Sequence, residues 1–198
     1  MRSFLNVLVT GMVLALPLCG TAVAQTPTHK LGRTPSAEEI RAWDISIDPE
    51  GKGLPPGSGT APEGAAIYAR RCAVCHGPTG AEGEPPAKGR RTAPVLVGGQ
   101  GTISSPQPVK TIGSFWPFAT TIWDYMRRAM PLYEEGSLQP AELYALTAFL
   151  LYRNGIIQES DVMDAQSLPK VQMPNRNGFV PAEPGWKPRT PKPVGSYP

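Results

Sequence analysis

Apolar residues recur at helical spacing in three separate stretches of the chain. The clearest stretch opens at Pro140 and Glu142 and ends at Asn154-Gly155, a pair typical of a helix C-cap. The apolar positions that recur within it are Leu143, Leu146, Phe149 and Leu150. The sequence therefore predicts an amphipathic helix here, and it is the strongest helix signal in the chain.

Two further helices are predicted upstream of this one. The first begins in a capping box, Thr60-Ala61-Pro62-Glu63, and runs into Cys72 and Cys75. The second is expected to begin with Thr121 and Asp124 as its N-cap pair and to end before Pro131, because helix is disfavoured at the residue that precedes a proline. The apolar positions of the two helices are Ala66, Ile67 and Tyr68 in the first and Ile122, Trp123, Met126 and Ala129 in the second. This pattern predicts a small all-α fold.

Residues that interrupt regular structure dominate the rest of the chain, which has 24 prolines and 21 glycines among 198 residues. The turn-rich segment Asp48–Thr60 is expected to form neither helix nor strand, and Gly77–Gly101 reads as a loop. The proline-rich end, Pro181–Pro198, is expected to be extended. A short helix is predicted after Ser36-Ala37-Glu38-Glu39, with Ile40 and Trp43 on it.

The first 24 residues have the pattern of an export signal. Arg2 supplies a charged start, an apolar run extends from Val7 to Leu18, and Ala22-Val23-Ala24 fits a cleavage site. The apolar run is too short to cross a bilayer comfortably. We therefore expect export to the periplasm, with an uncleaved anchor or a lipid on Cys19 as the alternative.

The stretch Arg71–Gly77 carries the most specific chemistry, because it contains the motif Cys72-Ala73-Val74-Cys75-His76. Two thiols on one helical turn, followed directly by a histidine, are typical of c-type haem attachment. Each thiol forms a thioether with one haem vinyl group, and the imidazole is an axial ligand of the iron. A redox dithiol or half of a zinc site is the competing interpretation, and the adjacent histidine and the lack of a second cysteine pair argue against both. The net charge of +3 is small and no basic block is present, so nucleic-acid binding has no support.

The ligands of such a haem iron can be narrowed further. A backbone carbonyl commonly holds the far nitrogen of the axial histidine, and Pro94 is our candidate for it, although Pro94 also fits an ordinary loop proline. A methionine thioether on the other face would suit an electron carrier. We favour Met130, which lies between two predicted helices; the alternatives are Met173, His29 or an open iron. Side chains that could meet the haem propionates, though most are expected to be surface charges or core aromatics, are Lys88, Arg90, Arg91, Arg127, Arg128, Trp116, Trp123 and Tyr125.

Taken together, these motifs resemble the class I cytochrome c family. In that family an attachment helix with Cys-x-x-Cys-His precedes a proline-containing loop, a Met-Pro loop and a C-terminal helix, matched here by Cys72–His76, Pro94, Met130-Pro131 and Leu138–Leu151. The resemblance implies a small helical domain around one covalently bound haem c, with Cys72, Cys75, His76 and Met130 binding the cofactor. We accordingly divide the chain into a signal peptide (1–24), an N-terminal extension with a short helix (25–60), a cytochrome c domain (61–157) and an irregular, Pro-rich C-terminal extension (158–198).

Four longer segments are similar to the cytochrome subunit of bacterial sulfane and sulfite dehydrogenases. These are Leu54–Thr60, Gly113–Pro131, Leu143–Ile157 and Leu168–Phe179. The resemblance implies a partner subunit that carries a molybdenum cofactor and oxidises the substrate, while this chain accepts the electrons and passes them to a downstream cytochrome or oxidase. The chain has one attachment motif, and therefore one haem, whereas longer members of the sulfane dehydrogenase type have two.

Two other functions stay open on the sequence. The chain could be a freestanding electron carrier without a dedicated partner. It could instead be a haem enzyme, such as a thiosulfate dehydrogenase or a peroxidase, which would need an open or displaceable position on the iron. We expect an electron-transfer protein rather than an enzyme, because the sequence after the predicted signal has no third cysteine and His29 is its one spare histidine.

Overall fold

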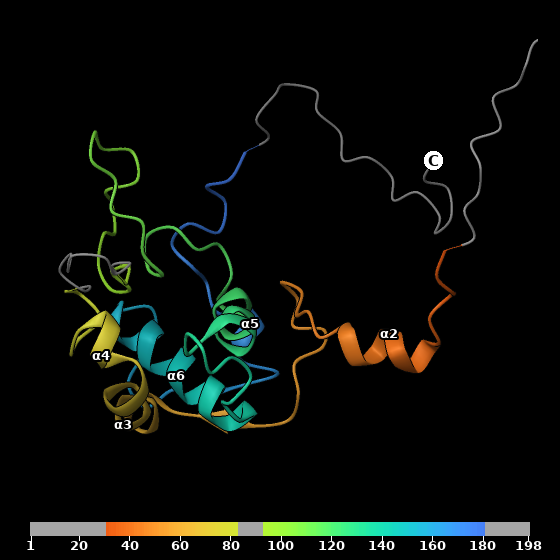
Figure 1. Ribbon diagram of the computed structural model, residues 1–198. Helices are drawn as coiled ribbons and strands as arrows, with labels where there is room; N and C mark the ends of the chain where they lie inside the picture. The colour runs from red at the N-terminus through yellow and green to blue at the C-terminus, as the bar shows by residue number, and fades with distance from the viewer. Residues whose placement is uncertain (1–30, 83–92, 181–198) are drawn as a thin grey trace, which may run out of the picture. The chain divides into compact units, whose positions relative to one another are not determined.

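A computed structural model describes residues 31–82 and 93–180 (Figure 1). The chain divides into two units, of which the second spans Ala37–Trp186 and contains every helix and strand described below. Of the first unit, residues 31–36 are described. The predicted signal peptide and proline-rich end lie outside the described residues, and so do the candidate residues His29, Lys88, Arg90 and Arg91.

The second unit is mainly helical, as predicted. Its helices are α2 (Ala37–Trp43), α3 (Ala61–Arg71), α4 (Ala73–His76), α5 (Ala119–Ala129) and α6 (Pro140–Arg153). The predicted starts of α3 and α6 are confirmed, because Glu63 and Glu142 accept hydrogen bonds from the backbone N–H groups of Thr60 and Gln139. The predicted end of α6 at Asn154 is also confirmed, whereas the helix expected to run into Cys75 is divided at Cys72 into α3 and α4. No helix in the described ranges is long and apolar enough to cross a membrane.

Helix α5 begins earlier than the sequence predicted. Its N-cap is Phe118, so Thr121 and Asp124 lie inside the helix and do not cap it. Asp124 is buried, where it accepts a hydrogen bond from the backbone N–H of Ile47 at 3.3 Å and pairs with Arg128. The local pattern was misleading because the aspartate has a tertiary partner, and because Ala119 and Thr120 are themselves buried against the core.

A two-stranded antiparallel sheet also departs from the prediction of irregular chain at 48–60. Strand β1 (Ser58–Gly59) pairs with β2 (Met163–Asp164), with Gly59 opposite Met163. Strands of two residues have no alternating pattern that a sequence could reveal. The pairing joins the segment before α3 to the segment after α6.

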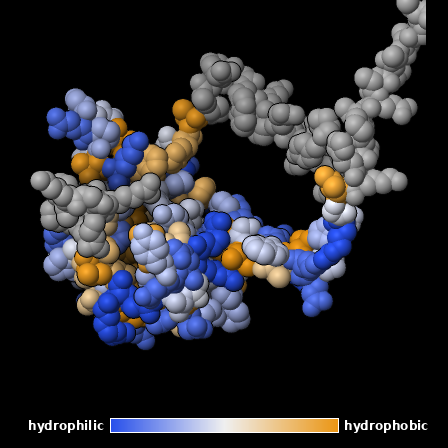
Figure 2. Space-filling view, in the orientation of Figure 1, coloured by the Kyte–Doolittle hydropathy of each residue, from blue (hydrophilic) through white to orange (hydrophobic). Residues whose placement is uncertain are grey.

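The core forms where α3 and α6 lie against each other (Figure 1). The contact is close at Gly64, where an added Cβ would lie 2.0 Å from the carbonyl oxygen of Ala145. Every residue of α6 from Leu143 to Leu151 is buried, because the helix is covered on several sides. Figure 2 shows that the visible face of this unit is mostly hydrophilic, with small apolar patches between the polar side chains.

Part of the segment after residue 157 packs on this helical core. A short 3-10 helix, η1 (Leu168–Lys170), contacts α5, and Leu168, Val171 and Met173 are all buried. The side-chain amide of Asn175 donates a hydrogen bond to the carbonyl of Phe115 at 2.7 Å. The C-terminal extension is therefore attached to the helical core at least as far as this residue.

Candidate haem site

The attachment motif occupies the junction of α3 and α4. Cys72 caps the end of α3 by donating its N–H to the carbonyl of Tyr68 at 2.9 Å. The carbonyl of Cys72 then accepts the N–H groups of Cys75 and His76 at 3.1 and 3.0 Å, which closes one helical turn. Both cysteines are half-buried free thiols, so the two sulfurs and the imidazole come from the same turn.

The imidazole of His76 is oriented by the loop that follows the motif. Its Nδ1 lies 2.9 Å from the carbonyl oxygen of Pro94, and because a carbonyl only accepts, Nδ1 must carry the proton. The predicted contact with Pro94 is thus confirmed. In the neutral imidazole this leaves the other ring nitrogen, Nε2, as the atom that can bind a metal, on a residue that is 9% exposed.

Tyr68 braces the same turn, a role that sequence reasoning missed. Its hydroxyl donates to the carbonyl of Gly77 at 3.0 Å, and its ring lies 5.0 Å from that of Phe149 on α6. Burial raises the pKa of Tyr68 to about 12, with smaller contributions from Cys72 and Glu82. The phenol therefore stays a neutral donor at any physiological pH.

The loop that contains Pro94 is fastened to the end of α6 by Asn154. The side-chain amide of this buried residue donates to the carbonyl of Leu96 at 3.2 Å, and its oxygen accepts the N–H of Gly98 at 3.0 Å. Gln100 completes the contact by donating to the backbone carbonyl of Asn154 at 2.8 Å. The sequence predicted Asn154 as a helix cap; its hold on a loop more than 50 residues away has no local signal.

Met130 follows α5 directly and is half-buried against the core cluster. Its N–H donates to the carbonyl of Met126 at 3.1 Å, so the side chain leaves the helix at its last turn. The alternative ligand Met173 is 3% exposed and belongs to the segment after η1. A link between Arg71 and Glu134, with nitrogen and oxygen 2.9 Å apart, brings the loop after Met130 next to the attachment motif.

Comparison with known proteins identifies the family. Residues 59–150 match the family model described as cytochrome C oxidase, cbb3-type, subunit III. A chain in the crystal structure of the sulfane dehydrogenase SoxCD from Paracoccus pantotrophus is 44% identical to this one; the match covers 77% of this chain and 72% of that chain, with a TM-score of 0.66. This chain is a c-type cytochrome.

Two other results add nothing to that assignment. The thiosulfate dehydrogenase TsdBA from Marichromatium purpuratum matches with 24% identity and a TM-score of 0.34, over 60% of this chain and 19% of that chain, which is too low to support an argument. Among curated proteins no match was found.

The chemistry of the donor set fits the haem c of this cytochrome. Two adjacent thiols, a histidine whose Nδ1 is already engaged, and a thioether at the exit of α5 are the groups that such a cofactor needs. Burial raises the pKa of the Cys72 thiol to about 11, an effect that the neighbouring Arg71 cation partly offsets. Redox-active dithiols instead rely on a thiol of lowered pKa, so this environment argues against that interpretation.

The side chains considered as contacts for the haem propionates differ in whether they already have protein partners. Arg128 pairs with Asp124, and Arg127 donates to the carbonyl of Ile45 at 3.3 Å, so both have protein partners. The rings of Trp116 and Tyr125 pack edge to face at 5.6 Å. Among the described residues, Trp123 alone keeps a buried side-chain N–H without a hydrogen-bond partner. No cluster of three or more His, Cys, Asp or Glu side chains occurs in the same ranges.

Proposed function

We propose that this cytochrome is the electron-accepting subunit of a molybdenum-dependent sulfane or sulfite dehydrogenase in the periplasm. As a c-type cytochrome it transfers electrons. The observation that carries the finer proposal is the 44% identity to a chain of a sulfane dehydrogenase over 77% of this sequence. So long a match includes the segments outside the haem motif, where a carrier without a partner would have little reason to resemble a dehydrogenase subunit.

Within this proposal each site residue has one role. Cys72 and Cys75 would hold the haem covalently, and His76 and Met130 would ligate its iron. When bound, the haem takes up and releases one electron at a time. The carbonyl of Pro94 keeps the His76 ring in one orientation by accepting a hydrogen bond from its Nδ1–H, with nitrogen and oxygen 2.9 Å apart. With both axial positions filled by the chain, oxidation of the sulfur substrate would take place on the partner subunit.

The partnership is tested by reconstitution. The holoprotein is mixed with a molybdenum oxidoreductase of the sulfane or sulfite dehydrogenase type, and reduction of the haem is followed after sulfite or a sulfane substrate is added. We expect fast reduction that needs both proteins and that an unrelated c-type cytochrome does not reproduce. Equal rates with the unrelated cytochrome would point to a freestanding carrier. Oxidation of thiosulfate by this chain alone would point to a haem enzyme.

The axial ligand is tested on the oxidised holoprotein. Thioether ligation to ferric haem gives a charge-transfer band in the near infrared, so Met130→Ala should abolish this band while Met173→Ala leaves it in place. The reverse result would assign the ligand to Met173. A band that is missing from the unmodified protein would mean that no methionine binds the iron.

A further inference from the structure

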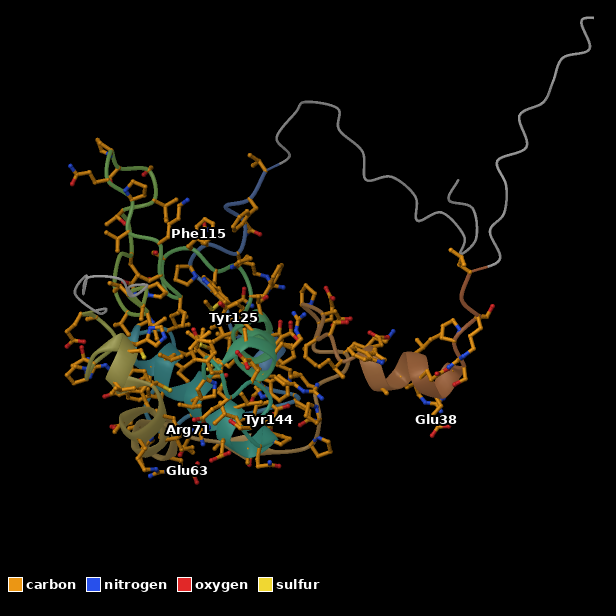
Figure 3. All side chains as sticks on the ribbon, in the orientation of Figure 1. Glu38, Glu63, Arg71, Phe115, Tyr125 and Tyr144 are labelled. Carbon is orange, nitrogen blue, oxygen red and sulfur yellow. The ribbon has the colours of Figure 1, made fainter. Side chains whose placement is uncertain are left out.

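The loop between α5 and α6 is held to the attachment motif by one arginine. Arg71, the last residue of α3, directs Nη2 at Glu134 Oε2 (2.9 Å) and at Ser137 Oγ (2.7 Å). The two acceptors lie 63 and 66 residues further along the chain. Figure 3 labels Arg71 on the helix that leads into Cys72. The contact therefore connects the residue before the first attachment cysteine to the loop that starts at Met130.

Beyond Met130 and Pro131, apolar packing contributes little to the position of this loop. All residues from 132 to 137 are exposed, and the next buried side chain is Leu138. Inside the loop, the N–H of Glu134 donates to the carbonyl of Pro131 at 2.9 Å, and the N–H of Ser137 donates to that of Glu134 at 3.2 Å. These turns give the loop a shape, but they do not fasten it to the rest of the domain.

Tyr133 shows that the shape is held under some strain. Its φ of 70° lies in the left-handed region, which is unfavourable for a tyrosine, and its side chain is 88% exposed. A residue keeps such a backbone conformation only where its surroundings enforce it. The N–H of Tyr133 donates to Glu135 Oε1 at 3.0 Å, and the contacts of Arg71 hold the neighbouring Glu134 and Ser137, so local and long-range contacts both constrain this turn.

We propose that Arg71 is a positioning residue that keeps the loop closed, so that the Met130 sulfur remains on the iron. The inference rests on the proposed ligation by Met130. A ligand held by a loop competes with any small ligand that reaches the iron while the loop is open, and the apparent affinity of that ligand is proportional to the open fraction. Removing Arg71 should raise this fraction.

The test uses imidazole as the competing ligand on the oxidised holoprotein, with loss of the near-infrared thioether band as the readout. The pair is partly exposed, at 33% for Arg71 and 63% for Glu134, so we expect Arg71→Ala to tighten apparent imidazole binding by about fivefold. Arg71→Lys keeps the charge but not the geometry that reaches two acceptors. Its apparent affinity for imidazole should lie between those of the unmodified protein and Arg71→Ala. High salt should raise the imidazole affinity of the unmodified protein toward that of Arg71→Ala, because salt screens exposed ion pairs.

Matched variants separate the loop contact from a general effect of charge or of haem attachment. Arg70→Ala removes a neighbouring exposed cation for which the described residues show no ion pair, and it should bind imidazole as the unmodified protein does. Glu134→Gln and Ser137→Ala weaken the same contact from the loop side and leave the residue beside Cys72 intact. Both should tighten imidazole binding.

The two hypotheses fail in different ways. If the thioether band is absent, or survives Met130→Ala, the ligation by Met130 is wrong and the inference falls with it. If the band depends on Met130 but Arg71→Ala and Glu134→Gln bind imidazole like the unmodified protein, the role of Arg71 alone is overturned.

Discussion

Replacing Gly64 by alanine tests the close crossing of α3 and α6. Gly64 lies inside α3, where alanine is intrinsically the better helix former by about 1 kcal/mol. On propensity alone, Gly64→Ala would therefore stabilise the protein. The structure predicts the opposite sign.

The magnitude follows from the atoms that the new methyl group would meet. Its Cβ would lie 2.0 Å from the carbonyl oxygen of Ala145 and 2.7 Å from Cβ of Phe149, whereas optimal contact is at about 3.5 Å. The nearest obstacle is backbone, so no side-chain rotation relieves the overlap and α3 must move away from α6. Overpacking of this kind costs about 1–3 kcal/mol, and a rigid obstacle places it near the upper end. After the gain in propensity, we expect a net loss of about 2 kcal/mol.

The assay is denaturant unfolding of the oxidised holoprotein followed by circular dichroism, with Ala66→Gly as the matched control. Ala66 is exposed two residues further along α3, so this variant measures the difference between glycine and alanine where nothing is crowded, and it should lose about 1 kcal/mol. Adding Ala145→Gly to Gly64→Ala should not restore stability, because the obstructing oxygen remains. A Gly64→Ala protein as stable as the unmodified one, beside a destabilised Ala66→Gly, would refute the close crossing of the two helices.

Three other contacts give predictions. The hydrogen bonds from Thr60 lower the pKa of Glu63, so Glu63→Gln should cost about 0.5–1 kcal/mol at neutral pH. The difference from the unmodified protein should decline as pH falls below the carboxyl's usual 4.5 and vanish below its lowered pKa in the folded state. Asn154→Ala leaves buried loop groups unpaired and should cost about 2–3 kcal/mol, with faster hydrogen exchange at the Gly98 amide. Tyr68→Phe should lower the free energy of unfolding by about 1 kcal/mol near neutral pH. The pKa of Tyr68 is raised from 10.0 to about 12 in the folded protein, so this difference should disappear as pH rises between those two values, which unfolding measured as a function of pH will show.

The sequence predicted those features that depend on neighbouring residues. Helix α6 was recognisable because its apolar positions and both of its end signals agree. The contact between His76 and Pro94 was predictable from chemistry, since an axial histidine needs an acceptor for its second nitrogen and the loop after the motif offers one. The helical fold class followed from the same local patterns.

Features that depend on distant residues were not predictable in this way. The hydrogen bonds of Arg71 cross more than 60 positions, and neither partner stands out locally from any other surface charge. For Asp124 the local pattern gave a wrong prediction. The residue suits a helix cap, but in the structure it lies inside α5 and pairs with Arg128. In both cases tertiary context decides the role of the side chain, and a single sequence does not contain that context.

Two of the long-range polar contacts share one arrangement. Arg71 ends α3 and fastens the loop after Met130, while Asn154 caps α6 and fastens the loop that carries Pro94. The helices that end at these residues are the pair that cross at Gly64. Their crossing therefore sets the spacing between the two loops, and with it the spacing between the proposed ligands His76 and Met130. Gly64→Ala should accordingly tighten imidazole binding even with Arg71 intact. The variant that combines Gly64→Ala with Arg71→Ala should bind imidazole more tightly than either single variant. Unchanged imidazole binding in a destabilised Gly64→Ala protein would mean that the loops are positioned independently of the helix pair.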